Sequence, residues 1–188
     1  MKPVVLASQS PRRIELLKKI IDQFEVQVSH VEETLDTDDP VTFVREISRR
    51  KAAEIAALFD HGIIIGADSI VVSNSRILGK PRNRDEAIEM LTFLSDRTHQ
   101  VYTGFTIIEN PGGKIHTDIE VTDVVFRKLK PWEIERYIDV AQPFDKAGSY
   151  GIQDESAVFV EKIDGCFYNV MGLPLTKLYN SLKPFFKL

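Results

Sequence analysis

Two arginines stand where a helix would normally carry acidic residues. The stretch LASQSPRR places Ser10 and Pro11 at the favoured first positions of a helix, so Arg12 and Arg13 fall in its first turn. The free N–H groups already make that end positive, and each exposed cation there costs about 0.3–1 kcal/mol. A bound phosphate would reverse this cost by meeting the N–H groups, both guanidinium groups and the hydroxyls of Ser8 and Ser10. Extension into water or pairing with the acidic segment of residues 30–39 would also relieve it, and the pattern leaves both interpretations open.

Asp68 is the main candidate for a reactive carboxylate. It follows the apolar run 63–65, and we expect separate buried strands on either side of residues 66–69, with the carboxylate emerging at a strand end. There it could orient or deprotonate a water, or hold a hard divalent cation. The plainer interpretation is a turn residue whose side chain bonds its own backbone.

Three lysines could bind phosphate. Lys51 lies in an expected helix, whereas Lys80 and Lys146 lie in the glycine-containing loop sequences LGKP and DKAG. Backbone N–H groups in such loops can help to surround a phosphate. Each lysine alone is equally typical of a solvated surface.

Several other kinds of site lack support. The sequence around LGKP has neither the Ser/Thr nor the first glycine of a P-loop, and no GxGxxG opens a helix. The four histidines are isolated and Cys166 is the only cysteine, which leaves no zinc motif and no internal disulfide. Any bound metal is therefore expected to be Mg²⁺ or Mn²⁺ held by oxygen ligands.

Apolar periodicity and turn residues predict a mixed α/β fold that positions these groups. Strands are expected at 4–6, 24–29, on both sides of 66–69, at 99–109, 115–127 and 157–163. Helices are expected from residues 11, 40, 83, 131 and 174, the second reaching residue 59. The sequence NPGG predicts a hairpin between the two longest strands, and PFDKAGSYGIQD is typical of a functional loop.

Composition favours one soluble folded unit. The 188 residues include 43% hydrophobic and 28% charged side chains, which is typical of globular proteins. The net charge of −4, with Lys and Arg spread along the chain, argues against a protein that coats nucleic acid. No segment resembles a signal peptide or a membrane span, and one cysteine fits a reducing compartment. We therefore expect a cytoplasmic protein without nucleic-acid or membrane partners.

Six short motifs together resemble one known family. They are, in chain order, LASQSPRR, GADSIVV, GKP, VTDVVF, DKAGSYGIQ and GLP. This combination is similar to that of the Maf family of nucleotide pyrophosphatases over essentially the whole chain. The resemblance implies a single domain over residues 1–188 with an inosine-triphosphatase-like α/β fold, in which a mixed sheet and two lobes flank a central nucleotide cleft. It also implies hydrolysis of nucleoside triphosphates to monophosphate and pyrophosphate with a divalent cation, Mg²⁺ or Mn²⁺.

The same resemblance implies a role for each residue at a matching position. Asp68 would be the catalytic carboxylate, and it would share the metal with Glu33. The basic residues that bind phosphate would be Arg12, Arg13, Lys51, Lys80 and Lys146, and we add Ser8 because its hydroxyl is a further donor in the first turn. The residues that select the substrate would be Arg12, Ser69 and Gln153.

The three selecting residues favour pyrimidine nucleotides. Arg12 and Gln153 match the members that act on dTTP and UTP, whereas Ser69 stands where those members usually carry threonine. Serine keeps the hydroxyl, and the Gln153 amide suits the carbonyl and N–H edge of a pyrimidine. We therefore expect dTTP and UTP as substrates, with modified pyrimidine triphosphates as further candidates.

Two other expectations concern the protein's wider role. A homodimer is expected only from the prevalence of twofold assemblies. The alternative to an enzyme is a non-catalytic, nucleotide-binding regulator of cell division, which would need the cations but not the carboxylate of Asp68.

Overall fold

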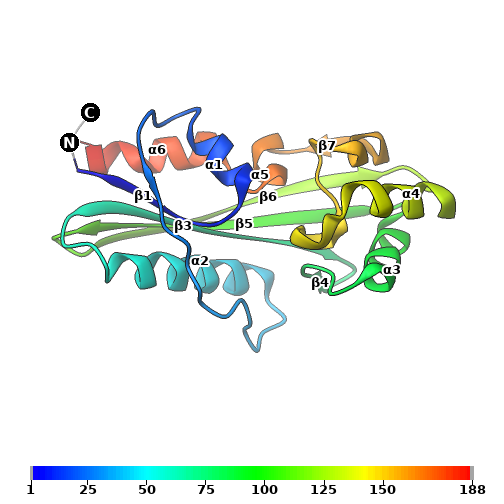
Figure 1. Cartoon of the computed structure of the whole chain (residues 1–188), viewed down its shortest axis with the longest axis horizontal. Coiled ribbons are helices and arrows are strands. Elements are labelled where there is room, and N and C mark those ends of the chain that lie inside the picture. The colour runs from blue at the N-terminus through cyan, green and yellow to red at the C-terminus, as the bar shows by residue number, and fades with distance from the viewer. Residues whose placement is uncertain (1, 187–188) are drawn as a thin grey trace.

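A mixed sheet of seven strands runs through the computed structural model, which describes residues 2–186 (Figure 1). Residues 1 and 187–188 of the domain predicted over 1–188 lie outside the described residues. The strands are β1 (Val4–Ala7), β2 (Glu25–Val26), β3 (Gly62–Ser73), β4 (Arg76–Leu78), β5 (Thr98–Asn110), β6 (Lys114–Phe126) and β7 (Val160–Asp164). Their order is β2-β1-β3-β5-β6-β7, with β4 also paired to β3. β1 is parallel to both of its neighbours and the other pairs are antiparallel, which confirms the mixed α/β class.

Helices cover both faces of this sheet. They are α1 (Pro11–Leu17), α2 (Pro40–Ala56), α3 (Arg84–Leu94), α4 (Pro131–Ala141), α5 (Phe167–Met171) and α6 (Leu175–Phe186), with the 3₁₀ turns η1 (Pro143–Asp145), η2 (Ala147–Ser149) and η3 (Glu155–Phe159). Figure 1 shows α1, α5 and α6 on one side of the sheet and α2 on the other, with α3 and α4 gathered at one end. No helix in the described part of the chain is long and apolar enough to cross a membrane.

Side chains of β3 alternate between the two faces. Ile63 and Ile65 join the core beneath α1 and α6, whereas Ile64 packs in a separate core with Ile55 of α2. A third core joins α3, α4 and the far ends of β5 and β6. The core is thus divided between two packed ends of the molecule, one under α1 and α6 and one at α3 and α4, in agreement with the two lobes expected.

Two glycines let α2 lie unusually close to the sheet. A methyl group built at Gly66 would stand 2.5 Å from the carbonyl oxygen of Ser48, and one at Gly104 would overlap the carbonyl of Val44. Only hydrogen fits at both positions, so the helix backbone rests directly on β3 and β5. This close approach fixes the height above the sheet of every side chain that α2 carries.

The predicted break at residues 66–69 is wrong, because β3 is one continuous strand through Asp68. β1 pairs with it only as far as Gly66, and β4 begins to pair with it at Val71. In the described structure, residues 67–70 therefore have a partner strand, β5, on one side only. Asp68 therefore lies inside β3, but at the level where the neighbouring strand β1 ends.

Other predicted boundaries hold with local exceptions. The strand expected at 24–29 shrinks to β2, an edge strand whose Val26 is 42% exposed and has no core to pack against. The helix expected to reach residue 59 ends at Ala56. The strand expected at 157–163 begins at Val160, because Asp154 accepts a hydrogen bond from the Ser156 N–H and starts η3 instead. The hairpin at NPGG is confirmed, and the side chains of Asp39 and Asn83 cap the starts of α2 and α3.

A buried polar pair predicts how stability depends on pH. His99 is 1% exposed, and its Nε2 lies 2.7 Å from the Tyr150 hydroxyl. Burial lowers the pKa of His99 to about 4, so between that value and the ordinary 6.5 the unfolded chain binds a proton that the folded protein refuses.

We therefore expect the free energy of unfolding to fall by up to about 3 kcal/mol as the pH drops from 7 to 4 because of this residue. Urea unfolding at several pH values would measure the slope. His99→Gln should flatten it across this window, and an unchanged slope in that variant would contradict the assignment.

Candidate active site

A pocket of about 490 Å³ opens where β3 lacks a second partner strand. Its size is within the usual range for sites that hold small molecules. Every residue predicted for the site contributes to its wall: Ser8, Arg12, Arg13, Glu33, Lys51, Asp68, Ser69, Lys80, Lys146 and Gln153. These residues span 146 positions of sequence, from 8 to 153, and come from both packed ends of the molecule.

Lys51 and Asp68 form the buried centre of the pocket. The Lys51 Nζ lies 2.7 Å from the Asp68 Oδ1, and their side chains are 8% and 7% exposed. Asp68 points toward α2 because even-numbered side chains of β3 face that helix, and the close packing at Gly66 brings Lys51 within reach. The turn role considered for Asp68 is thus replaced by a position inside a strand beside a buried cation.

Glu33 completes a chain of charges that includes Lys51. Its Oε1 lies 2.7 Å from the Lys51 Nζ, and its Oε2 lies 2.8 Å from the Lys80 Nζ. Burial alone would raise the pKa of Glu33, but the two lysines outweigh it and lower the pKa to about 2. Glu33 therefore carries a full negative charge at neutral pH.

The donor set fits a hard divalent cation. Glu33 and Asp68 each place a carboxylate oxygen 2.7 Å from the same ammonium nitrogen, so both oxygens converge on one positively charged point. No group of three or more acidic, His or Cys side chains suited to a metal occurs among residues 2–186. Two carboxylates suffice for Mg²⁺, which usually keeps several waters and binds substrate phosphates.

Arg13 is held by protein acceptors in this structure. Its Nε donates to the Gly172 carbonyl at 2.8 Å, its Nη1 to the Ala67 carbonyl at 2.9 Å and its Nη2 to the Ser69 hydroxyl at 2.9 Å. Burial lowers its pKa, and the nearby charge of Asp68 opposes that effect. The side chain thus ties α1 to the stretch of β3 that has β5 as its one partner strand, and each of its three nitrogens makes one such bond.

Arg12 pairs with an acidic side chain, but its partner is Asp145 and not the acidic segment of residues 30–39. Its Nη1 lies 3.0 Å from the Asp145 Oδ2, and the Lys146 Nζ lies 2.9 Å from the Oδ1 of the same carboxylate. Ser10 is the N-cap residue of α1 but its side chain makes no capping bond, and its N–H donates to the Ser8 hydroxyl at 3.2 Å.

The sequence did not single out Asp145 or the apolar wall. Tyr150, Val71 and Val101 also line the pocket, and the positive φ of Gly148 lets its loop pass close to Val71. Asp145 and Tyr150 both lie in the loop predicted to be functional, which was the available signal. The sequence could not have identified Val71 and Val101 as part of the pocket wall, because a valine in a strand most often packs in the hydrophobic core.

The side chains that line the pocket carry a positive net charge, although the net charge of the whole chain is negative. Five cationic and three carboxylate side chains line it, a net charge of +2, whereas the whole chain carries −4. Such a pocket attracts polyanions, and backbone and side-chain donors at its wall suit phosphate oxygens.

Comparison with known proteins identifies the family. A family model described as "Maf-like protein" matches residues 3–185. The chain belongs to the Maf family. A Maf relative from Carboxydothermus hydrogenoformans, named dTTP/UTP pyrophosphatase, is 48% identical over 96% of this chain and 97% of its own length. A relative of the same name from Bacillus cereus is 47% identical over 98% of this chain and 96% of its own length. Another, from Clostridium perfringens (strain SM101), is 46% identical over 96% of this chain and 95% of its own length.

One solved structure also aligns with this Maf protein. The Staphylococcus aureus Ham1 protein matches 66% of this chain and 72% of its own, with a TM-score of 0.49 and 19% identity.

Proposed function

We propose that this Maf protein hydrolyses dTTP and UTP to the nucleoside monophosphate and pyrophosphate. The observation that carries the proposal is the buried carboxylate of Asp68 set among five cations in one pocket of suitable size. A site that only bound polyanions would gain nothing from a buried carboxylate, because it would repel the ligand. The names of the relatives support the pyrimidine triphosphates as substrates.

In the proposed reaction a water attacks the α-phosphorus. Asp68 orients this water and accepts its proton as the new P–O bond forms, while the bond from the α-phosphorus to the bridging oxygen breaks and pyrophosphate leaves. Lys51, Lys80 and Lys146 stabilise negative charge on the phosphate oxygens, since they are the lysines that face the pocket. Arg13 contributes by holding β3 and α1 in place, and its charge adds to the positive field.

We propose Mg²⁺ or Mn²⁺ as the cofactor, held by Glu33 and Asp68. When bound, such a cation neutralises phosphate charge and makes a coordinated water more acidic. Lys51 is the cation between these carboxylates in this structure, and its long side chain can turn toward a phosphate when the two oxygens bind elsewhere.

We propose Arg12, Ser69 and Gln153 as the residues that select the nucleotide. The Ser69 hydroxyl accepts a hydrogen bond from Arg13 Nη2 at 2.9 Å and shares another with the Thr103 hydroxyl at 2.8 Å, so these neighbours hold it at the pocket wall. Modified pyrimidine triphosphates remain candidate substrates, because one methyl group changes discrimination by only about 1–3 kcal/mol.

The wider context is also a proposal. The chain would act as one domain over 1–188 in the cytoplasm, with a homodimer as its assembly. The lone cysteine, Cys166, fits a reducing compartment.

A substrate panel tests the function. Pyrophosphate release should be fastest with dTTP and UTP in the presence of Mg²⁺ or Mn²⁺, slower with purine triphosphates, and lost when a chelator removes the metal. Chromatography of the products should show monophosphate and no diphosphate. Tight binding of dTTP without any hydrolysis would overturn the proposal and support the nucleotide-binding regulator instead.

A further inference from the structure

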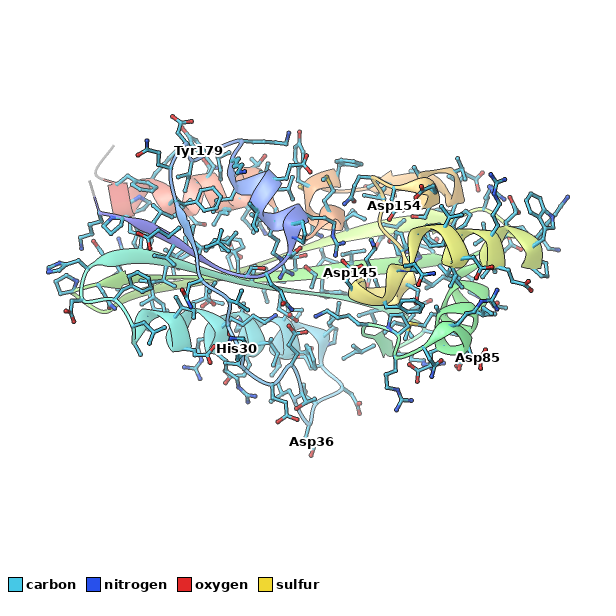
Figure 2. The ribbon with its side chains drawn as sticks, viewed as in Figure 1. His30, Asp36, Asp85, Asp145, Asp154 and Tyr179 are labelled. Atoms are coloured by element: carbon cyan, nitrogen blue, oxygen red, sulfur yellow. The ribbon has the colours of Figure 1, made fainter. Side chains whose placement is uncertain are left out.

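Asp145 forms ion pairs with two of the cationic side chains that face the pocket. One of its carboxylate oxygens lies 3.0 Å from Arg12 Nη1, and the other lies 2.9 Å from Lys146 Nζ. Arg12 belongs to the start of α1, whereas Lys146 and Asp145 belong to the loop after α4, so the contact joins segments 133 positions apart. Figure 2 shows Asp145 near the middle of the molecule, and its side chain lines the pocket.

The backbone presents this carboxylate to the pocket. Gln142 ends α4 in a left-handed conformation with φ 45°, and Pro143 then starts the single turn of η1 that ends at Asp145. Proline fixes one backbone angle of this turn. Asp145 therefore reaches the pocket from a short constrained turn, and its side chain remains 55% exposed.

A neighbouring carboxylate shows what a structural role looks like in the same loop. Asp154 accepts hydrogen bonds from the Ser156 N–H at 3.0 Å and the Ser156 hydroxyl at 2.9 Å, and it contacts the Tyr137 hydroxyl at 3.3 Å. Asp154 also lies 3.8 Å from the Lys146 Nζ through its Oδ2, whereas both carboxylate oxygens of Asp145 bond at 2.9–3.0 Å to cations that face the pocket. Its partners are groups that a substrate also seeks.

We propose that Asp145 is a displaceable counter-carboxylate that holds Arg12 and Lys146 in the absence of nucleotide and weakens the binding of pyrophosphate. The inference rests on the proposed function, because it takes the pocket to bind polyphosphate. A polyphosphate must break both ion pairs to reach the two cations, and once bound it lies beside the negative charge of Asp145. The same repulsion speeds the departure of pyrophosphate after the bond is cleaved.

The charge state and exposure of Asp145 agree with this role. Burial would raise its pKa, but the hydrogen bond from Lys146 and the charge of Arg12 outweigh it and lower the pKa, so the group is ionised at neutral pH. Arg12 and Lys146 are 20% and 13% exposed, but the 55% exposed carboxylate leaves both pairs open to water, and a phosphate offers Arg12 a bidentate partner with more charge. Displacement is therefore favourable, and the carboxylate opposes binding without preventing it.

Removal of this one charge should increase affinity. We expect Asp145→Asn to bind inorganic pyrophosphate about two- to tenfold more tightly than the wild type, measured by titration calorimetry in Mg²⁺ buffer. The matched control is Asp139→Asn, which removes a 59% exposed carboxylate paired to Arg84 at 2.9 Å outside the pocket wall. The control should bind pyrophosphate as the wild type does. If Asp145→Asn damaged the fold, its affinity for pyrophosphate would fall, so a higher affinity cannot result from misfolding.

A second measurement links the gain to Arg12. In an Arg12→Ala background, Asp145→Asn should produce a smaller gain, because one of its two ion pairs is already absent. Equal or weaker pyrophosphate binding by Asp145→Asn in the wild-type background would overturn the inference. Hydrolysis of dTTP is assayed on the same samples: its absence from the wild type overturns the proposed function, while a gain in pyrophosphate affinity would still support the role of Asp145.

Discussion

Asp68→Asn is expected to lower the rate of pyrophosphate release from dTTP by at least about 10²–10⁴-fold. The amide keeps the shape of the carboxylate but cannot accept the proton of the attacking water, and it is a poor ligand for a divalent cation. Lys51 would not be left as an unpaired buried charge, because its Nζ also lies 2.7 Å from Glu33. The variant should therefore remain folded, which thermal unfolding would check.

The control for Asp68→Asn removes an acidic side chain that the mechanism does not use. Asp36 lies in the same acidic segment as Glu33 but points away from the body of the protein, as Figure 2 shows. Asp36→Asn should release pyrophosphate at the wild-type rate. Activity of Asp68→Asn within tenfold of that rate would sink the catalytic assignment, and loss of dTTP binding by the folded variant would indicate a binding role instead.

The chemical parts of the site could be predicted from sequence, but their pairing could not. Arg12, Lys80 and Asp68 become candidates through the combination of motifs, because each of these residues alone also has a plain structural interpretation. Which carboxylate meets which cation depends on contacts between segments far apart in sequence, such as Glu33 with Lys80 and Asp145 with Arg12. No local pattern encodes those contacts.

The fold was predictable wherever one face of an element is buried. The long hairpin of β5 and β6 follows from alternation and NPGG, and the starts of α2 and α3 follow from their capping residues. The error at β3 has a physical cause, because Gly66 and Asp68 are residues that usually end strands. Here Gly66 serves the close approach of α2, and Asp68 is compensated by Lys51, so tertiary contacts override local preference.

Gly104→Ala is expected to destabilise the protein by about 2–3 kcal/mol. The new methyl group would overlap the Val44 carbonyl and lie 3.1 Å from the Arg45 nitrogen, both backbone atoms of α2 that cannot rotate away. The helix must therefore shift outward, and it carries Lys51 away from Asp68 as it does so. Turnover of dTTP should fall together with stability, although Gly104 does not line the pocket.

Urea unfolding separates this effect from a general cost of replacing glycine. Gly79→Ala is the matched control, because a methyl group there would meet nothing within 4 Å. Its midpoint should stay near that of the wild type, whereas the midpoint of Gly104→Ala should fall and its melting temperature should drop by about 5–10 °C. Equal stability of the two variants would mean that α2 can move without cost, and the distance between Lys51 and Asp68 would then not depend on the packing of α2 against β3 and β5.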